Sequence, residues 1–297
     1  MCGIVGLFLK DKRLGPDLGT LISEMLVKMS DRGPDSAGLA LYNEGTEFTK
    51  KITLKTNKPN GCNIIKEAIE KKAKNEFQIK FRGDHCIVSY SPESSGLLTD
   101  VLRSLEIVVQ VMSEGECIEI YKEACSPKTF IENCNIKNFS GTHAVGHTRM
   151  ATESAVTTLG AHPFSTAEDQ CLVHNGSLSN HNIIRRLLRS EGFEFETDND
   201  SEVAASYLSW KISTGMSLEK ALDDALKSLD GFFTFLVGTK KGFGVLRDKI
   251  ACKPAVLAET DQYVAFGSEY RALTDLPGIA SAKVWEPKPA QVYFWTN

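Results

Sequence analysis

The order of the hydrophobic patterns along the chain constrains its fold more than any single residue does. An apolar run rich in glycine and β-branched residues opens the chain at 2–9 and predicts a buried strand, and an amphipathic helix is predicted over 18–29. Two more amphipathic helices are predicted at 201–213 and 218–229. Short strand-like runs follow these helices, at 232–238, 243–247, 255–258, 263–267 and 291–296. Strands, then helices, then strands predict an α+β layered domain rather than alternating strands and helices around a parallel sheet.

The middle of the chain, from about 43 to 140, has weaker patterns. It contains one predicted helix over 64–74 and one predicted strand over 105–112. The patterns sharpen again at THAVGHTRMAT, where a strand runs into a loop, and at CLVHNGSLSN, where a strand is expected to run into a glycine turn and a helix. We therefore expect a single domain over 1–297 with an elaboration at about 43–140.

Composition excludes several classes of protein. The hydrophobic fraction of 42% is typical of a globular protein. The formal net charge of −4 argues against binding to nucleic acid through general electrostatic attraction. No apolar run approaches the roughly 18 residues that a membrane helix needs, and no secretion signal is present, so we expect a cytoplasmic chain that binds no membrane. The eight cysteines form no CxxC pair, so we expect no metal site, and the sequence indicates no other cofactor.

Cys2 stands apart from the other cysteines because it directly follows the initiator Met1. Aminopeptidase removes a methionine that precedes a small residue, so the mature chain should begin with a thiol and a free α-amine on one residue. An α-amine has a pKa of about 7.7–8.0 and can act as general base for its own nucleophile. A cysteine at position 2 also occurs by chance. Function is favoured here by Gly3 and Gly6, which would let another segment or a ligand approach closely.

Polar residues near two further predicted strands could bind or activate a substrate. Arg149 lies at the end of a strand, where its planar fork could hold a carboxylate through two hydrogen bonds; the alternative is an ordinary surface arginine. Asn175 and Gly176 could supply a side-chain and a backbone N–H to a developing oxyanion. An Asn-Gly turn is the commoner structure for such a pair, so this alternative also stays open.

Acidic residues precede the predicted helix at 201–213. Asp198, Asp200 and Glu202 lie where side chains cap a helix, and one aspartate can cap while another binds an ammonium group. His162, in the sequence AHPF, either shapes a pocket or turns a loop.

Taken in order, the segments MCGIVG, RGPDSAG, GHTRMAT, AHPF, HNG and DSE resemble the glutaminase domain of class II glutamine amidotransferases, which are N-terminal nucleophile hydrolases. RDKIACKP at 247–254 and FGSEYRAL at 266–273 resemble two later segments of the same family, so the similarity runs from residue 2 to about 274. The resemblance implies a four-layer αββα sandwich, in which two largely antiparallel sheets lie between helical layers. The unmatched part is chiefly 43–140.

The resemblance also implies a role for each matched residue. Cys2 would attack the side-chain amide of L-glutamine and form a glutamyl thioester, which water would hydrolyse to L-glutamate after ammonia has left. Asn175 and Gly176 would form the oxyanion hole. Arg149 would bind the α-carboxylate of the substrate, and Asp200 would bind its α-ammonium group.

Supporting residues follow from the same resemblance. Asp200 is preferred over Asp198 because the order Asp-Ser-Glu matches the family pattern. His162 would lie in the wall of the substrate pocket. Arg32 and Asp35 would support the loop near the nucleophile, without a sharper role.

No segment of the sequence resembles a synthase domain, so we expect a stand-alone glutaminase subunit. The resemblance is to glutamate-synthase-like and N-methylglutamate-synthase-associated subunits, which implies a heteromeric complex where ammonia passes to a separate synthase subunit. Two alternatives remain: an amidohydrolase acting on another γ-glutamyl amide, and a regulatory subunit that keeps the fold without catalysis. The complete set of site residues disfavours the regulatory subunit, since a scaffold has no physical need for it.

Overall fold

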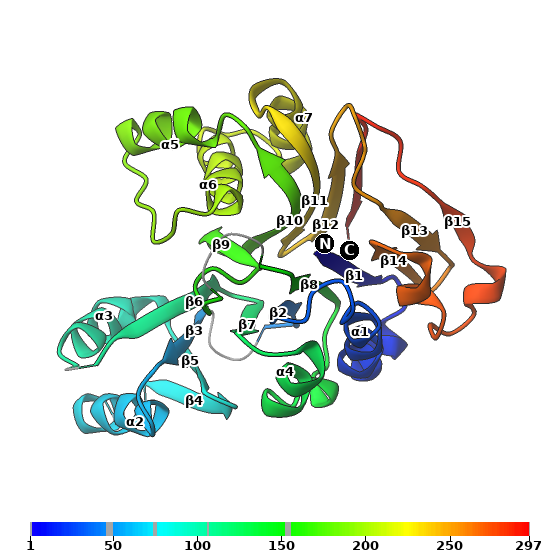
Figure 1. Ribbon diagram of the computed structural model, residues 1–297. Coiled ribbons are helices and arrows are strands. Elements are labelled where there is room, and N and C mark those ends of the chain that lie inside the picture. Colours follow the sequence, from blue (N-terminus) through cyan, green and yellow to red (C-terminus); the bar gives the residue numbers. More distant parts are fainter. Residues whose placement is uncertain (1, 46–49, 74–75, 106, 152–155, 297) are drawn as a thin grey trace.

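Two large antiparallel sheets, packed face to face, form the centre of the computed structural model (Figure 1). The structure describes residues 2–45, 50–73, 76–105, 107–151 and 156–296. Parts of four sequence predictions lie outside these described residues: Met1, Thr152 of the GHTRMAT segment, the last residue of the helix expected over 64–74, and one residue of the strand expected over 105–112. Every strand pairing within the described ranges is antiparallel.

The two large sheets differ in size. In the described part of the chain, the first has seven strands, in the order β15 (Lys283–Trp285), β13 (Val256–Glu259), β14 (Tyr263–Gly267), β1 (Gly3–Leu9), β8 (His143–Arg149), β2 (Ser36–Tyr42) and β7 (Ile118–Glu123). The second has five, in the order β16 (Val292–Thr296), β12 (Gly242–Arg247), β11 (Gly231–Thr239), β10 (Gln170–Leu178) and β9 (Phe164–Ala167).

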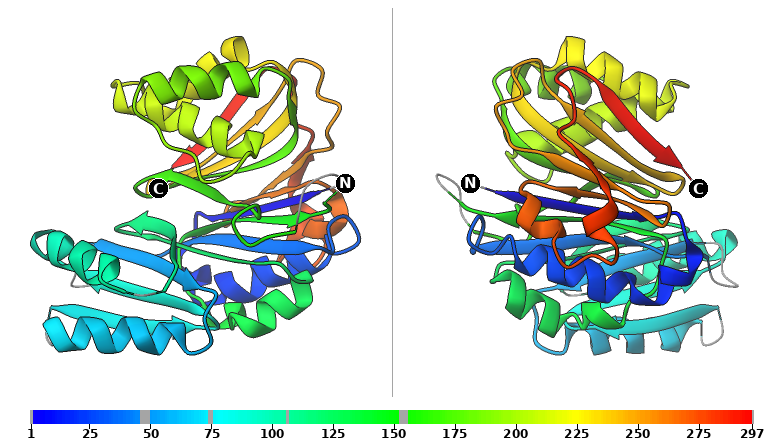
Figure 2. Two further views of the ribbon diagram at one scale, coloured as in Figure 1. Left: turned by 60° about the vertical axis from the view of Figure 1, so that its left-hand side comes forward. Right: turned by 90° about the vertical axis from the view of Figure 1, so that its right-hand side faces the viewer.

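Helices cover the outer face of each large sheet, which makes four layers (Figure 2). The seven-stranded sheet is covered by α1 (Leu18–Val27) and α4 (Pro127–Asn133). The five-stranded sheet is covered by α6 (Asp200–Ser213) and α7 (Leu218–Ser228), with α5 (His181–Ser190) beside α6. Five short 3-10 helices in the described residues, η1 to η5, consist of Lys12–Asp17, Pro92–Ser94, Ile136–Asn138, Tyr270–Leu273 and Ile279–Ser281, respectively. The expected αββα sandwich is therefore confirmed.

The side chains of β1 explain why the sheets stack in this way. Val5 and Leu7 belong to the apolar core beneath α1, whereas Ile4 and Phe8 belong to the core between the two large sheets. Successive side chains of a strand point to opposite faces, so a strand that is apolar on both faces must be covered on both. Because β14 and β8 pair with β1 on either side, the chain just before it, at Cys2, is held in a defined place.

The described residues between 50 and 115 form a separate four-stranded sheet, called here the insert sheet (Figure 1). Its strands lie in the order β4 (Phe77–Arg82), β5 (His85–Tyr90), β3 (Lys50–Thr56) and β6 (Val109–Gly115). The helices α2 (Gly61–Lys72) and α3 (Ser95–Arg103) enclose an apolar core against one of its faces. The chain order β-α-β-β-α-β with this pairing is the ferredoxin-like arrangement. Among the described helices of the whole chain, none combines the length and the apolar composition required for crossing a membrane.

The sequence patterns indicate only part of this middle segment. The helix expected over 64–74 corresponds to α2 and the strand expected over 105–112 to β6, but the patterns do not indicate α3, β3, β4, β5, β7 or α4. The reason is visible in β3, where Lys51 and Lys55 alternate with apolar residues and are nevertheless buried, because each forms an ion pair with a glutamate of β7. Lysines that alternate with apolar residues usually indicate a solvent-exposed strand face. Periodicity alone therefore does not show that this face of β3 is buried against β7.

Buried His143 makes the stability of this fold depend on pH. Its ring stacks on Tyr42 with centroids 4.1 Å apart, and its Nε2 lies 2.8 Å from the carbonyl oxygen of Thr239. Burial lowers the pKa of His143 from 6.5 to about 4. Because the unfolded chain binds this proton at a higher pH than the folded chain does, the free energy of unfolding should fall as the pH decreases from about 6.5 towards about 4.

For His143 alone, the expected loss is about 2 kcal/mol between about pH 7 and about pH 5, since one pKa unit corresponds to about 1.4 kcal/mol. Urea unfolding at both pH values measures it. A His143→Gln variant should lose about 2 kcal/mol less than the wild type over this interval. An equal pH dependence in both proteins would show that the pKa of His143 is the same in the folded and the unfolded chain.

Candidate active site

Cys2 is fixed through its backbone carbonyl from two directions. The Nε of Arg32 donates to this oxygen at 3.0 Å, and the Nδ2 of Asn175 donates to it at 3.2 Å. Arg32 is buried and its Nη1 lies 2.5 Å from the Oε1 of Glu269. The sequence implied only a loose role for Arg32; the structure shows that it ties residue 2 to the segment FGSEYRAL.

The serine of that segment holds Ile4, the second residue of β1. The backbone N–H of Ile4 donates to the Oγ of Ser268 at 2.9 Å, and the N–H of Ser268 donates to the carbonyl of Ile4 at 2.9 Å. Two residues after Ile4, a Cβ on Gly6 would lie 2.5 Å from the Cδ2 of Leu236 in the facing sheet, so the expected close approach is present. The start of β1 is thus fixed by Ser268, which follows the neighbouring strand β14, and by Leu236 of the facing sheet.

Asn175 and Gly176 lie within β10 and not in a turn, so the turn expected at this glycine is wrong; the turn that precedes α5 lies at 179–180. The strand continues to Leu178 and pairs with β11 along its whole length. Gly176 has a φ of 150°, and a Cβ there would lie 2.0 Å from the carbonyl oxygen of Phe232. Only glycine allows the two strands to stay paired at this point. The pairing keeps Asn175 and the backbone of Gly176 next to Cys2.

Arg149 is the last residue of β8 and is buried. Its Nη1 donates to the carbonyl of Gly160 at 3.0 Å. Asp35 holds the chain around this arginine, because the N–H of Asp35 donates to the carbonyl of Arg149 at 3.1 Å and the N–H of Ala151 donates to Asp35 Oδ2 at 2.8 Å. Asp35 therefore sets the direction in which the chain leaves β8.

The start of α6 presents two aspartates in different ways. Asn199 is the helix cap, since its Oδ1 accepts from the N–H of Ser201 at 2.9 Å. Asp200 Oδ2 accepts from the N–H of Leu178 at 2.9 Å, which ties this carboxylate to the end of β10. Asp198 is exposed. Asp200 is thus the carboxylate with a fixed position.

Glu202 holds the loop that leads to these aspartates. Its Oε1 accepts from the N–H of Glu196 at 2.8 Å, and its Oε2 accepts from the N–H and the hydroxyl of Thr197 at 2.8 and 2.5 Å. Because Glu202 is buried, these bonds compensate for removing its charge from water. The segment from Thr197 to Glu202 therefore contains one helix cap, one loop anchor and two further aspartates.

Three buried histidines lie beneath Cys2 and Asn175. The ring of His162 stacks on His147 with centroids 4.0 Å apart, and His147 Nε2 lies 3.1 Å from the carbonyl oxygen of His174. Burial lowers the pKa of His147 to about 3 and also lowers the pKa values of His162 and His174. Both ring nitrogens of His162 and the Nε2 of His174 have no hydrogen-bond partner among the described residues. Neutral rings with unused nitrogens suit a small polar molecule in the cavity.

A cavity of about 710 Å³ brings most of the sequence-predicted residues together. Its lining includes Cys2, Arg149, His162, Asn175, Gly176 and Asp200, together with Asp198. Arg32 and Asp35 do not line it but hold the residues that do. A thiol, two groups with N–H donors, a cation and an anion around one cavity suit the binding of a zwitterion and nucleophilic attack on it.

Sequence reasoning missed Lys253, which also lines this cavity. Arg247 Nη2 donates to the carbonyls of Ala251 and Lys253 at 2.5 and 2.8 Å, and Asp248 Oδ1 accepts from the N–H of Ile250 at 2.6 Å. The Arg-Asp pair thus folds the loop back towards the cavity. The segment RDKIACKP was the available signal, but its resemblance alone does not show that the lysine faces the site.

In the described part of the chain, one group of side chains has the composition of a metal site. The ligand atoms of His85, Glu123 and Cys134 lie within 4.8 Å of one another and all three residues are buried. However, His85 Nε2 accepts from the N–H of Lys122 at 3.3 Å, which places the proton of the neutral ring on Nδ1, and this nitrogen faces the Cys134 sulfur at 3.8 Å. Lys55 already supplies a positive charge 3.4 Å from Glu123. We therefore interpret the group as a hydrogen-bonded chain.

Comparison with known proteins adds independent findings. A model of the glutamine amidotransferase domain matches residues 147–275. The glutamine amidotransferase-like protein GlxB of Rhizobium meliloti is 56% identical over 297 residues, which cover all of this chain and 99% of that protein. A relative from Methanothermobacter thermautotrophicus is 33% identical over 308 residues, and the match covers 99% of this chain and 99% of that protein.

A solved structure shows the same fold. Glutamine phosphoribosylpyrophosphate amidotransferase from B. subtilis superposes with a TM-score of 0.65 at 17% identity. The match covers all of this chain but only 47% of that one, so the chain spans about half the length of the solved protein.

Proposed function

Because the chain belongs to the class II glutamine amidotransferases, we propose that it hydrolyses L-glutamine to L-glutamate and ammonia through a thioester on Cys2. The observation that carries this proposal is the common cavity around Cys2, Asn175, Gly176, Arg149 and Asp200. A thiol next to paired oxyanion donors suits acyl transfer, and opposite charges suit the head group of an amino acid.

In the first step, the α-amine that Cys2 gains when Met1 is removed takes the thiol proton, and the sulfur attacks the side-chain amide carbon of glutamine. The negative charge that develops on the amide oxygen is stabilised by the Nδ2 of Asn175 and the N–H of Gly176. One of the two N–H groups on Asn175 Nδ2 already binds the Cys2 carbonyl, and the other is free for the substrate. Collapse of this intermediate breaks the C–N bond, and ammonia leaves with the proton from the amine.

In the second step, water attacks the thioester, releases L-glutamate and restores the thiol. Throughout both steps Arg149 binds the α-carboxylate and Asp200 the α-ammonium group, so that the amide end of the substrate points to Cys2. His162 forms the wall behind the substrate. Its neutral ring can donate or accept a hydrogen bond without adding charge.

Asp200→Asn and Asp198→Asn should differ strongly in their effect on glutamine binding. Asparagine keeps the oxygen that accepts from Leu178 but removes the charge opposite the ammonium group, so Asp200→Asn should raise KM for glutamine about 100-fold. Asp198→Asn should change KM by less than about threefold, because this side chain is exposed and its charge is screened. Steady-state glutaminase assays on both variants measure this. The reverse order of effects would identify Asp198 as the ammonium ligand.

The ammonia is proposed to reach a synthase on a separate polypeptide, of the glutamate-synthase-like or N-methylglutamate-synthase-like kind, while residues 1–297 act as one glutaminase domain. Two relatives that match over 99% of their own length support a stand-alone subunit, in contrast to the solved protein of which this chain covers 47%. Purification of the tagged chain from native cells should yield a heteromeric complex. Recovery of this chain alone, at the size of a monomer, would contradict the separate synthase.

The choice of substrate is tested by comparing L-glutamine with other γ-glutamyl amides on that purified material. Arg149 and Asp200 would bind any γ-glutamyl head group, so the head group alone does not select glutamine. Glutamine should have the highest kcat/KM, and glutamate and ammonia should appear in equal amounts when no acceptor is present. Faster turnover of a substituted γ-glutamyl amide would favour the amidohydrolase instead.

A further inference from the structure

Lys122 is a buried lysine that none of the sequence motifs contains. It lies on β7, and only 5% of its surface is exposed. Its Nζ donates to three backbone carbonyls, those of Ala161 at 3.1 Å and of Leu159 and Pro163 at 3.4 Å. An ammonium group has three N–H donors and no acceptor, so one segment of chain uses its full hydrogen-bonding capacity.

That segment, residues 159–163, forms one wall of the cavity around Cys2 and is called here the wall segment. Its Gly160 accepts the hydrogen bond from Arg149, and its His162 lines the cavity directly. The positive charge of Lys122 also helps to lower the pKa of His162, which places the ammonium group near this ring. Lys122 therefore contacts the wall that holds two of the proposed substrate-binding residues.

Gly38 shows how closely the wall segment passes over β2 and β7. Gly38 pairs with Lys122 across these strands. A Cβ on Gly38 would lie 2.1 Å from the carbonyl oxygen of His162 and 2.8 Å from the Cβ of Lys122. Because Gly38 has no side chain, the wall segment can pack closely against β2. The ammonium group of Lys122 binds the carbonyls of the same segment.

A second segment of the cavity lining, just before α6, is held by a charge of the other sign. Buried Glu202 binds the backbone of Glu196 and Thr197, just before Asp198. Burial lowers the pKa of Lys122 from 10.5 to about 8, while the negative charges of Glu196 and Glu202 oppose this shift. Lys122 and Glu202 thus each bind the backbone of one chain segment that lines the cavity in which the substrate would lie.

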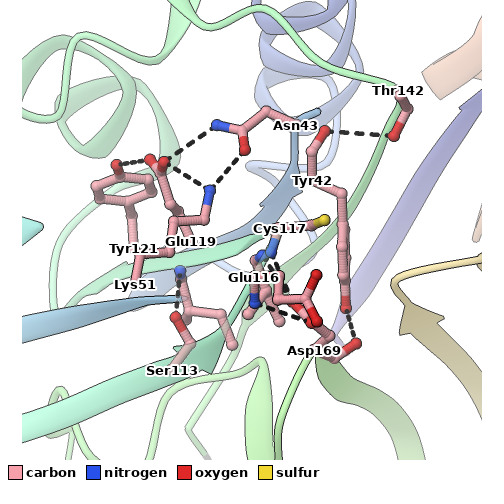
Figure 3. Close-up of polar contacts among 12 residues, drawn as sticks. Tyr42, Asn43, Lys51, Ser113, Glu116, Cys117, Glu119, Tyr121, Thr142 and Asp169 are labelled. Carbon is pink, nitrogen blue, oxygen red and sulfur yellow. Dashed lines mark hydrogen bonds and ion pairs between the residues drawn. The ribbon is translucent and has the colours of Figure 1, made fainter. Parts of the chain in front are cut away.

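The other face of β7 is fixed to the insert sheet. Glu119 lies 3.0 Å from the Nζ of Lys51 on β3, and Tyr121 donates to the second oxygen of Glu119 at 2.5 Å (Figure 3). Asn43 also contacts both members of this pair, at 2.6 and 3.1 Å. Because successive side chains of β7 alternate between faces, Lys122, which follows Tyr121, points to the opposite face, towards the wall segment.

We propose that Lys122 is a positioning residue of the glutamine pocket, which holds the wall segment in place for Arg149 and His162 and makes the region around 43–140 part of the catalytic unit. This inference rests on the proposed function. It assigns no direct chemistry to Lys122, which acts through the residues of the wall segment.

The test uses the full-length chain with its natural N-terminus and two reagents for Cys2. A diazo-ketone analogue of glutamine needs the γ-glutamyl pocket in order to react, whereas iodoacetamide needs only an accessible thiol. Lys122→Met removes the three donors and keeps the length of the side chain. Lys80→Met is the matched control, because Lys80 is an exposed lysine on β4 of the insert sheet.

Lys122→Met should slow labelling of Cys2 by the diazo-ketone about tenfold or more and raise KM for glutamine by a similar factor, because a displaced binding group loses its orientation. Labelling of Cys2 by iodoacetamide, followed by peptide mapping, should change by less than about twofold, and Lys80→Met should change neither rate. If Lys122→Met does not fold, Gly38→Ala should give the same pattern, because its Cβ displaces the wall segment without removing a charge.

Equal rates with the diazo-ketone in the wild type and in the folded variant would overturn the inference. An equal slowing with both reagents would also overturn it, since a merely structural role affects the thiol in general. Failure of the wild type itself to react with the diazo-ketone, although iodoacetamide labels Cys2, would overturn the proposed function and this inference with it.

Discussion

Replacing Cys2 with alanine should lower kcat for glutamine hydrolysis by a factor of about 10⁴ or more. In the proposed mechanism the thiol forms the bond to the substrate, and no described neighbour in the cavity offers a second thiol. Glutamine should still bind, because Arg149 and Asp200 are unchanged and the Cys2 carbonyl contacts involve only the backbone. Release of glutamate measures the first effect, and calorimetric titration with glutamine measures the second.

Cys62→Ala is the matched control, because Cys62 lies on α2 beside the insert sheet and does not line the cavity. It should leave kcat unchanged within about twofold, as expected for a substitution outside the site. More than about 1% of the wild-type rate in Cys2→Ala would mean that another group is the nucleophile.

Asn175→Ala should lower kcat about 10²- to 10³-fold and change KM little. Loss of one oxyanion donor removes an interaction that exists mainly in the transition state, so it costs about 3–4 kcal/mol of activation free energy. The Cys2 carbonyl keeps its bond from Arg32 at 3.0 Å, so the position of the nucleophile should be largely preserved. Steady-state kinetics, with kcat and KM determined separately, measure this.

The control for this variant is Asn138→Ala, which removes an exposed amide outside the cavity. Labelling of Cys2 by iodoacetamide should proceed at the wild-type rate in both variants. If Asn175→Ala instead slows labelling as strongly as it slows turnover, then Asn175 acts by holding Cys2 and does not stabilise the oxyanion.

Much of the site could be predicted from the sequence because its residues lie at the ends of strongly apolar strands. Cys2 precedes β1 and Arg149 ends β8, and these two strands are neighbours in the seven-stranded sheet. Asn175 lies on β10 of the facing sheet, opposite them. Apolar runs identify these strands, and the ordered motifs then indicate which polar residues belong to the same site.

The behaviour of Gly176 could not be predicted from local sequence. Asn-Gly pairs favour turns, and nothing in the sequence of β10 shows that β11 will pair across this position. The partner strand lies more than fifty residues further along the chain, and its backbone leaves space only for a hydrogen. Long-range pairing therefore overrides the local turn preference.

The middle segment and Lys122 were beyond sequence reasoning for a related reason. The lysines of β3 look solvent-exposed in the sequence, and only their glutamate partners on β7 make burial favourable. Lys122 itself belongs to no sequence motif, and its proposed role depends on backbone carbonyl groups that lie about forty residues away in the chain. Arg32 and Asp35 are intermediate cases, since motifs mark them but only the structure shows which backbone groups they hold.

We propose that Cys2, freed of Met1, is the nucleophile in a pocket that recognises a γ-glutamyl group. Intact mass and peptide mapping after treatment with the diazo-ketone analogue of glutamine test it most directly. We expect a chain without Met1 that carries one adduct on Cys2, and excess L-glutamine should prevent the formation of this adduct. An adduct on another cysteine, or a chain that retains Met1 and still hydrolyses glutamine, would contradict it.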